Sequence, residues 1–322
     1  MLVSLSIHLL RFIIPWKAQP MSDTTRRDFL KSSAACLTAA SLPLAANSIA
    51  SADMKKSNTP KGFKKSVKIG MVGIKGTLAE KMQVLKELGY DALELNSPGG
   101  PSADEVKAAI DKTGLPIHGV VDSVHWRQTL SDSSPDVRAK GLEALKTAIR
   151  ASKSYGGTSV LLVPGKVTKE VTYDQCWERS IAEIKKAIPL AEELNIQILM
   201  ENVWNDFLTD PTETARFIDE LESDHVGAYF DVGNAVRYSP PHEWVPILGK
   251  RIKKLDIKDY SKDGRGFKAD ILDGDVDWPK VMQALHKIGF TGYGTAEIRG
   301  GDKARLTEIA KRMNTIFDYY PG

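Results

Sequence analysis

The sequence predicts one (β/α)8 barrel, in which eight parallel strands close on themselves inside a ring of helices. Short apolar runs alternate eight times with helical patterns along residues 66–322. The apolar runs lack apolar–polar alternation, as expected for parallel strands that are buried on both faces. A doubly wound sheet would instead show a glycine-rich phosphate loop after its first strand, and Val72-Gly73-Ile74-Lys75-Gly76 has too few glycines.

The elements follow one another in regular order. The expected strands are Val67–Val72, Ala92–Leu95, Ile117–Val121, Ser159–Val163, Gln197–Glu201, Val226–Asp231, Ile252–Lys258 and Tyr293–Ile298. The expected helices cover residues 78–88, 103–112, 135–155, 173–194, 211–222, 241–249, 277–288 and 302–319. Helix starts carry capping chemistry, as in Asp210-Pro211-Thr212-Glu213, and several helices stop at glycine or asparagine.

The N-terminal segment is expected to lie outside the barrel. Residues 25–31 (Thr-Arg-Arg-Asp-Phe-Leu-Lys) resemble the twin-arginine export motif, an apolar stretch covers 32–46, and Ala50-Ser51-Ala52 forms a cleavage site. The stretch is too short to span a membrane. We therefore expect a signal peptide at 1–52, with Met21 as an alternative start, a linker at 53–65 and a periplasmic mature protein.

The net positive charge of the chain comes from that segment. It carries five of the 44 basic and two of the 41 acidic residues, so the remainder is formally neutral. A neutral barrel with few histidines does not suit a nuclease, and no nucleic-acid partner is expected. Only Cys176 follows residue 52, so no internal disulfide is expected in the mature chain.

Four predicted strands carry a carboxylate at or near their carboxyl end. They supply Glu201, Asp231, Asp256 and Glu297, each placed to face the barrel axis at the carboxyl end of its strand. Clustered carboxylates repel one another and need a compensating cation. The two glutamates are also placed to move protons on and off carbon, which makes the chain a candidate enzyme.

These residues lie in motifs that resemble those of the xylose-isomerase-like barrels of sugar isomerases and epimerases. The motifs are Glu201-Asn202, Phe230-Asp231-Val232-Gly233, Ile257-Lys258-Asp259, Gly274-Asp275-Val276-Asp277-Trp278 and Glu297. The resemblance implies one divalent cation held by Glu201, Asp231, Asp256 and Glu297. Two family histidines are replaced here, by Asp256 and Asn234. An all-oxygen ligand set favours Mn²⁺, Mg²⁺ or Ca²⁺ over zinc, with Mn²⁺ or Mg²⁺ expected, and loss of the cation site is the alternative.

The resemblance further implies a keto-sugar substrate and an enediolate formed by proton transfer. Glu201 and Glu297 would remove and return the proton, and Lys258 would donate to the developing oxyanion or, alternatively, pair with Asp259. Expected substrate-binding residues are His125, Trp126, Trp204, Asn234 and Arg299. The alternatives are loop packing for the His125-Trp126 pair and a surface position for Arg299.

Three functions stay open on the sequence. The first is a metal-dependent keto-sugar isomerase or epimerase. The second is a lyase or hydratase that acts on a 3-keto-glycoside or keto-inositol, and the third is a non-catalytic sugar-binding barrel. The sequence does not specify the sugar, and a homo-oligomer is compatible with it.

Overall fold

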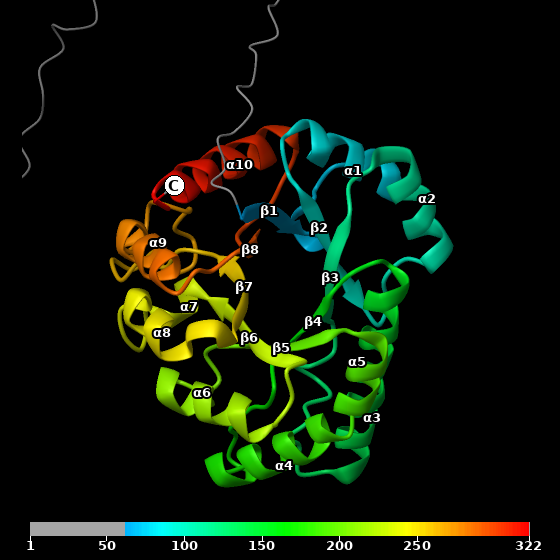
Figure 1. Cartoon of the computed structure of the whole chain (residues 1–322), viewed down its shortest axis with the longest axis vertical. Coiled ribbons are helices and arrows are strands. Elements are labelled where there is room, and N and C mark those ends of the chain that lie inside the picture. Colours follow the sequence, from blue (N-terminus) through cyan, green and yellow to red (C-terminus); the bar gives the residue numbers. More distant parts are fainter. Residues whose placement is uncertain (1–61, 322) are drawn as a thin grey trace, which may run out of the picture. The chain divides into compact units, whose positions relative to one another are not determined.

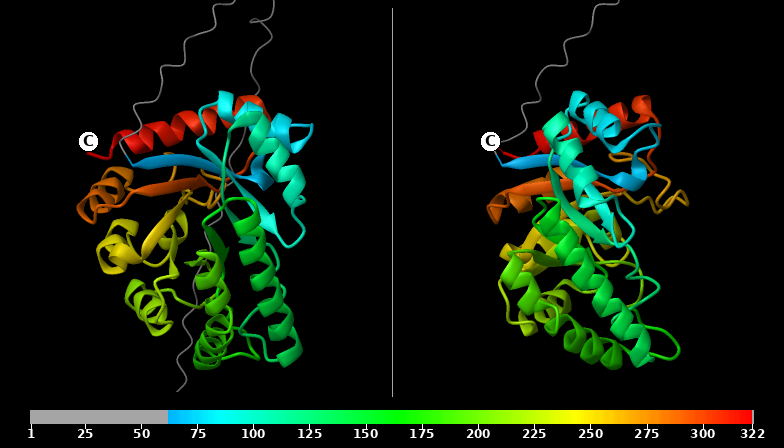
Figure 2. Two further views of the ribbon diagram at one scale, coloured as in Figure 1. Left: turned by 45° about the vertical axis from the view of Figure 1, so that its right-hand side comes forward. Right: turned by 90° about the vertical axis from the view of Figure 1, so that its right-hand side faces the viewer.

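The predicted barrel is confirmed. The computed structural model describes residues 62–321, and their eight parallel strands pair in chain order and close between β8 and β1 (Figure 1). The helices lie outside the strands (Figure 2). The expected signal peptide and residues 53–61 of the expected linker lie outside the described residues.

The strands are β1 (Phe63–Lys68), β2 (Ala92–Ser97), β3 (Ile117–Asp122), β4 (Ser159–Leu162), β5 (Gln197–Glu201), β6 (Val226–Asp231), β7 (Ile252–Ile257) and β8 (Gly292–Ala296). The α-helices are α1 (Leu78–Glu87), α2 (Ala103–Thr113), α3 (Pro135–Ser154), α4 (Tyr173–Lys185), α5 (Ile188–Leu194), α6 (Pro211–Glu220), α7 (Val232–Ala235), α8 (Pro241–Leu248), α9 (Trp278–Lys287) and α10 (Lys303–Asp318). Two short 3₁₀ helices, η2 (Ile69–Met71) and η3 (Gly249–Arg251), follow β1 and precede β7.

The first strand begins at Phe63, before the expected Val67, so residues 63–65 of the expected linker belong to the barrel. The lysine-rich sequence conceals this strand. The ring of Phe63 packs against Phe290 and Phe317, and the Lys65 ammonium donates to Asn314 Oδ1 at 2.7 Å. Because a long lysine stem can be buried when its head finds a partner, a basic run does not exclude a strand.

Two helical segments also differ from expectation. The helix expected over 173–194 is divided into α4 and α5, because Pro189 has no N–H to continue the ladder from α4. The short helix α7 was not expected. It starts directly after β6, and the Asp231 carboxylate caps it by accepting a hydrogen bond from Asn234 N at 2.8 Å.

The interior of the barrel contains a buried polar network below the strand ends. The Tyr229 hydroxyl donates to Thr295 Oγ1 at 2.7 Å or to Glu94 Oε1, which lies 3.1 Å away. Further down, Lys254 Nζ lies 2.9 Å from His118 Nδ1. These contacts link strands from opposite sides of the barrel and place His118 in the core.

Within residues 62–321, none of the helices combines the length and the apolar character that crossing a membrane requires.

Asp122, the last residue of β3, is expected to make the free energy of unfolding depend on pH. Burial raises the pKa of Asp122 to about 7 from 3.8, and a hydrogen bond from Val124 N only partly opposes it. Because the folded pKa is raised, this carboxyl stabilises the fold fully below pH 3.8 and loses that contribution as pH rises through 7. Asp122→Asn should therefore be more stable than the parent at pH 8, by a few kcal/mol at about 1.4 kcal/mol per pH unit.

The measurement is urea unfolding of both proteins at pH 5 and pH 8. The stability advantage of Asp122→Asn should shrink at pH 5, which lies between the usual pKa of 3.8 and the folded pKa of about 7. The exposed Asp318→Asn serves as the control and should change little at either pH. An equal effect of Asp122→Asn at both pH values would contradict the assignment.

Candidate functional site

A pocket of about 590 Å³ opens at the carboxyl ends of the strands. This is the end of a (β/α)8 barrel at which active sites form. Its volume falls in the range of small-molecule sites, roughly 300–1,000 Å³. It is lined by Lys68, Gly70, Met71, Asn96, Val121, Ser123, His125, Trp126, Glu201, Val203, Trp204, Asn234, Lys258, Phe267 and Glu297.

The structure brings the four predicted carboxylates together, and two of them, Glu201 and Glu297, line this pocket. Glu201, Asp231, Asp256 and Glu297 each offer an oxygen, and these four oxygens lie within 4.8 Å of one another. Strand register accounts for part of the arrangement, because Asp231 on β6 pairs directly with Asp256 on β7. Three of the four are buried, and Glu297 is partly exposed to the pocket.

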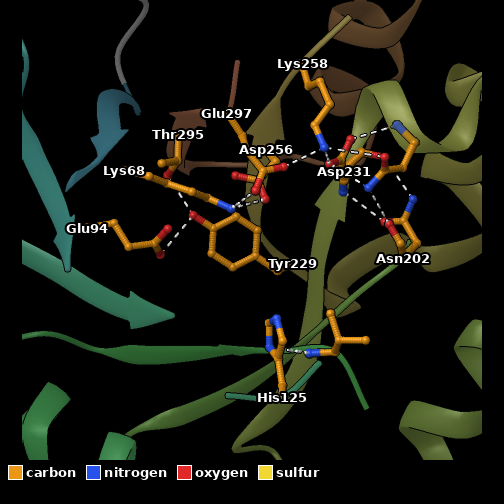
Figure 3. A network of polar contacts seen from close by, with 12 residues as sticks. Lys68, Glu94, His125, Asn202, Tyr229, Asp231, Asp256, Lys258, Thr295 and Glu297 are labelled. Atoms are coloured by element: carbon orange, nitrogen blue, oxygen red, sulfur yellow. Dashed lines mark hydrogen bonds and ion pairs between the residues drawn. The ribbon is translucent and has the colours of Figure 1, made fainter. Parts of the chain in front are cut away.

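Two lysines hold this cluster, and one of them was not predicted (Figure 3). Lys68 Nζ at the end of β1 lies 2.9 Å from Asp256 Oδ2 and 2.7 Å from Glu297 Oε1. Lys258 Nζ lies 2.8 Å from Asp231 Oδ2 and 2.6 Å from Glu297 Oε2. Each Glu297 oxygen therefore contacts a different ammonium group. Lys68 could have been found from its position, because it ends the first strand as the acidic residues end theirs.

Burial and these lysines separate the acidities of the two glutamates. Burial, with Glu297 nearby, raises the pKa of Glu201 to about 8. Burial also disfavours ionised Glu297, but Lys68 and Lys258 together outweigh it and lower its pKa below the usual value. Burial raises the pKa of Asp231 to about 6 and that of Asp256 well above its usual value. Three of the carboxyls therefore lack enough compensating charge.

The residues present fit a divalent cation. Asp256 Oδ1 is buried and has no hydrogen-bond partner among the described residues. Four carboxylates face two ammonium groups, which leaves two negative charges for a divalent ion to balance. Oxygens that bind one cation at about 2.0–2.6 Å lie at most ~5 Å apart, and the four here meet that limit. All donors are hard oxygens, which suits Mg²⁺ or Mn²⁺ better than zinc.

Two asparagines fix the orientation of Asp231. Asn202 Oδ1 accepts a hydrogen bond from Asp231 N at 2.8 Å, and Asn202 Nδ2 donates to Asp231 O at 2.9 Å. Asn234 Nδ2 lies 2.8 Å from Asp231 Oδ2 and 2.9 Å from the Asn202 carbonyl. Asn234 was expected to bind substrate. It lines the pocket, but its amide is already engaged, so it orients Asp231.

His125 presents a hydrogen-bond donor to the pocket. Burial lowers the pKa of His125 to about 3, so the ring is neutral. Its Nδ1 accepts a hydrogen bond from Val163 N at 3.1 Å (Figure 3). The single ring proton therefore resides on Nε2. That N–H makes no hydrogen bond within residues 62–321 and is free to donate to a substrate oxygen.

Aromatic side chains form the walls of the pocket. Trp204, expected to bind substrate, packs against the Arg237 guanidinium, 4.8 Å from its ring, and against Phe267, 4.7 Å between ring centroids. The more open surfaces are Trp126, which is 46% exposed, and Phe267, which is 39% exposed. Phe267 lies in the long loop after β7, and its role could not be derived from the sequence.

Asp259 anchors that loop and does not pair with Lys258. Its carboxylate accepts hydrogen bonds from Leu272 N at 3.1 Å, Val276 N at 3.2 Å and Trp278 Nε1 at 2.9 Å. These hydrogen bonds hold the end of the loop over residues 260–277 against Asp259, the residue that directly precedes the loop.

Arg299 does not reach the pocket. It is exposed after β8, is not among the pocket-lining residues, and its carbonyl accepts a hydrogen bond from Arg305 Nε. The expectation that it binds substrate is therefore not supported by its position.

Known proteins share this architecture. The L-ribulose-5-phosphate 3-epimerase of Salmonella paratyphi A is 22% identical over 231 residues, covering 66% of this chain and 79% of that protein. A solved D-tagatose 3-epimerase-like protein has a TM-score of 0.68 at 21% identity, covering 79% of this chain and 98% of that one. The 3-keto-D-glucoside 4-epimerase of E. coli has a TM-score of 0.66 at 17% identity, with the same coverage.

At these identities the solved structures establish the shared fold alone. Residues 82–316, well over half of the chain, match the family model described as a xylose isomerase-like TIM barrel. With a closed eight-stranded barrel and this match, the chain belongs to the xylose isomerase-like TIM barrel family.

Proposed function

We propose that this protein is a sugar isomerase or epimerase that acts on a keto-sugar by proton transfer at carbon. The observation that carries the proposal is the set of four strand-end carboxylates whose oxygens lie within 4.8 Å of one another, with Glu201 and Glu297 lining the pocket. The curated relative and the 3-keto-D-glucoside 4-epimerase described above are epimerases by name, which supports the same class of reaction.

The cation is part of this proposal. Glu201, Asp231, Asp256 and Glu297 would hold one divalent ion, with Mn²⁺ or Mg²⁺ preferred by the all-oxygen donors. A bound divalent ion polarises a carbonyl and makes the neighbouring C–H more acidic. Asn202 and Asn234 keep Asp231 oriented for this task, as partners of a ligating carboxylate do.

The chain's own residues would then carry out the proton transfer. One of the two glutamates takes the proton from the carbon next to the carbonyl, and the C–H electron pair forms the carbon–carbon double bond of an enediolate. The other glutamate delivers a proton to the opposite face for epimerisation, or to the neighbouring carbon for isomerisation. His125 Nε2–H lines the pocket as a donor for a substrate oxygen. The Lys258 ammonium, which is bonded to Asp231 and Glu297, would donate to the developing oxyanion by exchanging one of these contacts.

The direct test is loss of a substrate C–H signal by proton NMR in D₂O, with Mn²⁺ or Mg²⁺ added. A panel of ketoses and keto-glucosides should show exchange at one carbon, and chelation by EDTA should abolish it. Glu297→Gln should slow the exchange by roughly 10²–10⁴-fold, the usual contribution of a positioned acid or base.

The exposed Glu193→Gln provides a matched control that keeps the parent rate. An epimer or isomer as product supports the proposal, whereas an unsaturated sugar would replace it with the lyase. No exchange on any member of the panel in folded protein would reject the proposed chemistry.

Lys68 should also oppose cation binding. Its ammonium lies within 3 Å of two of the proposed ligands, so removing its charge leaves the cluster more negative. At an effective dielectric of about 20, one charge at this range changes binding by a few kcal/mol, so Lys68→Met should bind Mn²⁺ at least tenfold more tightly. Calorimetric titration with Mn²⁺ measures this directly.

Lys107→Met removes an exposed lysine of similar size and should leave the Mn²⁺ affinity unchanged. Circular dichroism establishes that both variants are folded. Weaker Mn²⁺ binding by folded Lys68→Met would show that this lysine organises the ligands more than it repels the ion.

A further inference from the structure

Two open aromatic side chains stand on opposite sides of the pocket mouth. Trp126 follows β3, and Phe267 lies in the loop after β7. In a closed barrel with strands in chain order, β3 and β7 are diametrically opposed (Figure 1). Among the described residues, large hydrophobic side chains exposed to solvent are Trp126, Ile247, Phe267 and Tyr319. Two of these four line the same pocket, which is the placement expected of surfaces that stack on sugar rings.

The pocket has, among the described residues, no lysine or arginine side chain that is free to bind a phosphate. Its only lysine or arginine side chains within the described residues are Lys68 and Lys258. Both are bonded to carboxylates of the cluster, which already carries excess negative charge. A phosphorylated sugar needs at least one uncommitted positive group or an array of backbone N–H donors. The pocket therefore favours an uncharged substrate.

A second cavity adjoins Trp126. It has a volume of about 220 Å³ and shares Trp126 with the main pocket. Its charged lining side chains are Arg127, Asp132, Lys166 and Glu170, two of each sign, and Thr168 adds a hydroxyl. Charge-balanced donors and acceptors next to an open indole ring suit the hydroxyl groups of a neutral sugar.

We infer that the substrate is a keto-glycoside of at least two sugar rings, the second of which binds on Trp126. The oxidised ring lies over the carboxylate cluster between Trp126 and Phe267. The second ring stacks on Trp126 and directs its hydroxyls into the adjoining polar cavity. This inference rests on the proposed function for the position of the oxidised ring, and it names the substrate class for that same site.

The test is saturation-transfer NMR and calorimetry on the purified protein with Mn²⁺. The probes are methyl 3-keto-glucoside, the 3-keto forms of cellobiose, maltose and trehalose, and D-ribulose 5-phosphate. At least one disaccharide should bind more tightly than the methyl glycoside and receive saturation on its second ring. Trp126→Ala should weaken that disaccharide roughly tenfold and abolish the second-ring signal, while the methyl glycoside loses less.

Arg127→Ala is a second variant that leaves the indole in place, and it should weaken only the disaccharide. Tyr319→Ala removes a similarly exposed aromatic ring outside the pocket and should alter the binding of neither probe. The inference is overturned if the methyl glycoside binds as tightly as every disaccharide, or if D-ribulose 5-phosphate binds best. Because these readouts report binding, they are independent of carbon–proton exchange, whose failure would reject the proposed reaction instead.

Discussion

The balance between four buried carboxylates and two lysines at the barrel mouth is the interaction on which the site depends. Each carboxylate comes from a different strand, so the parallel register of β5 to β8 is what forces them together. Burial makes every one of them costly to ionise. Lys68 and Lys258 outweigh that cost at Glu297 but offset only part of it at Glu201, Asp231 and Asp256. The same charge deficit makes the site suitable for a divalent ion and gives the two glutamates different acidities.

The closed barrel and the acidic cluster could be predicted because both follow from strand spacing and from the residue at each strand end. Lys68 was missed because the first strand was placed four residues too late, which hid a basic strand end inside an apolar run. The long loop after β7 has no periodicity, so the role of Phe267 could only come from the structure. Arg299 was expected at the pocket because it is close to Glu297 in the sequence. Its side chain does not line the pocket, so closeness in sequence was not sufficient.

The network inside the barrel complements the site above it. Tyr229 pairs in register with Glu201, and its hydroxyl reaches Thr295 on β8. Such cross-barrel hydrogen bonds restrain strands β6 and β8 with respect to each other. The two glutamates to which the proposed reaction assigns proton transfer, Glu201 at the end of β5 and Glu297 after β8, thereby stand on strands that this network restrains.

The anchoring of the loop after β7 allows the loop and the carboxylate cluster to change separately during evolution. Asp259 holds the far end of the loop through Leu272, Val276 and Trp278, so the start of α9 does not depend on the residues in between. Residues 262–268 are largely exposed and can therefore be exchanged at little cost to the fold, whereas Ala269 and Ile271 are buried in the core. A lineage built on this barrel could change which sugar it accepts by altering one tethered segment, while the proton-transfer groups stay under separate selection.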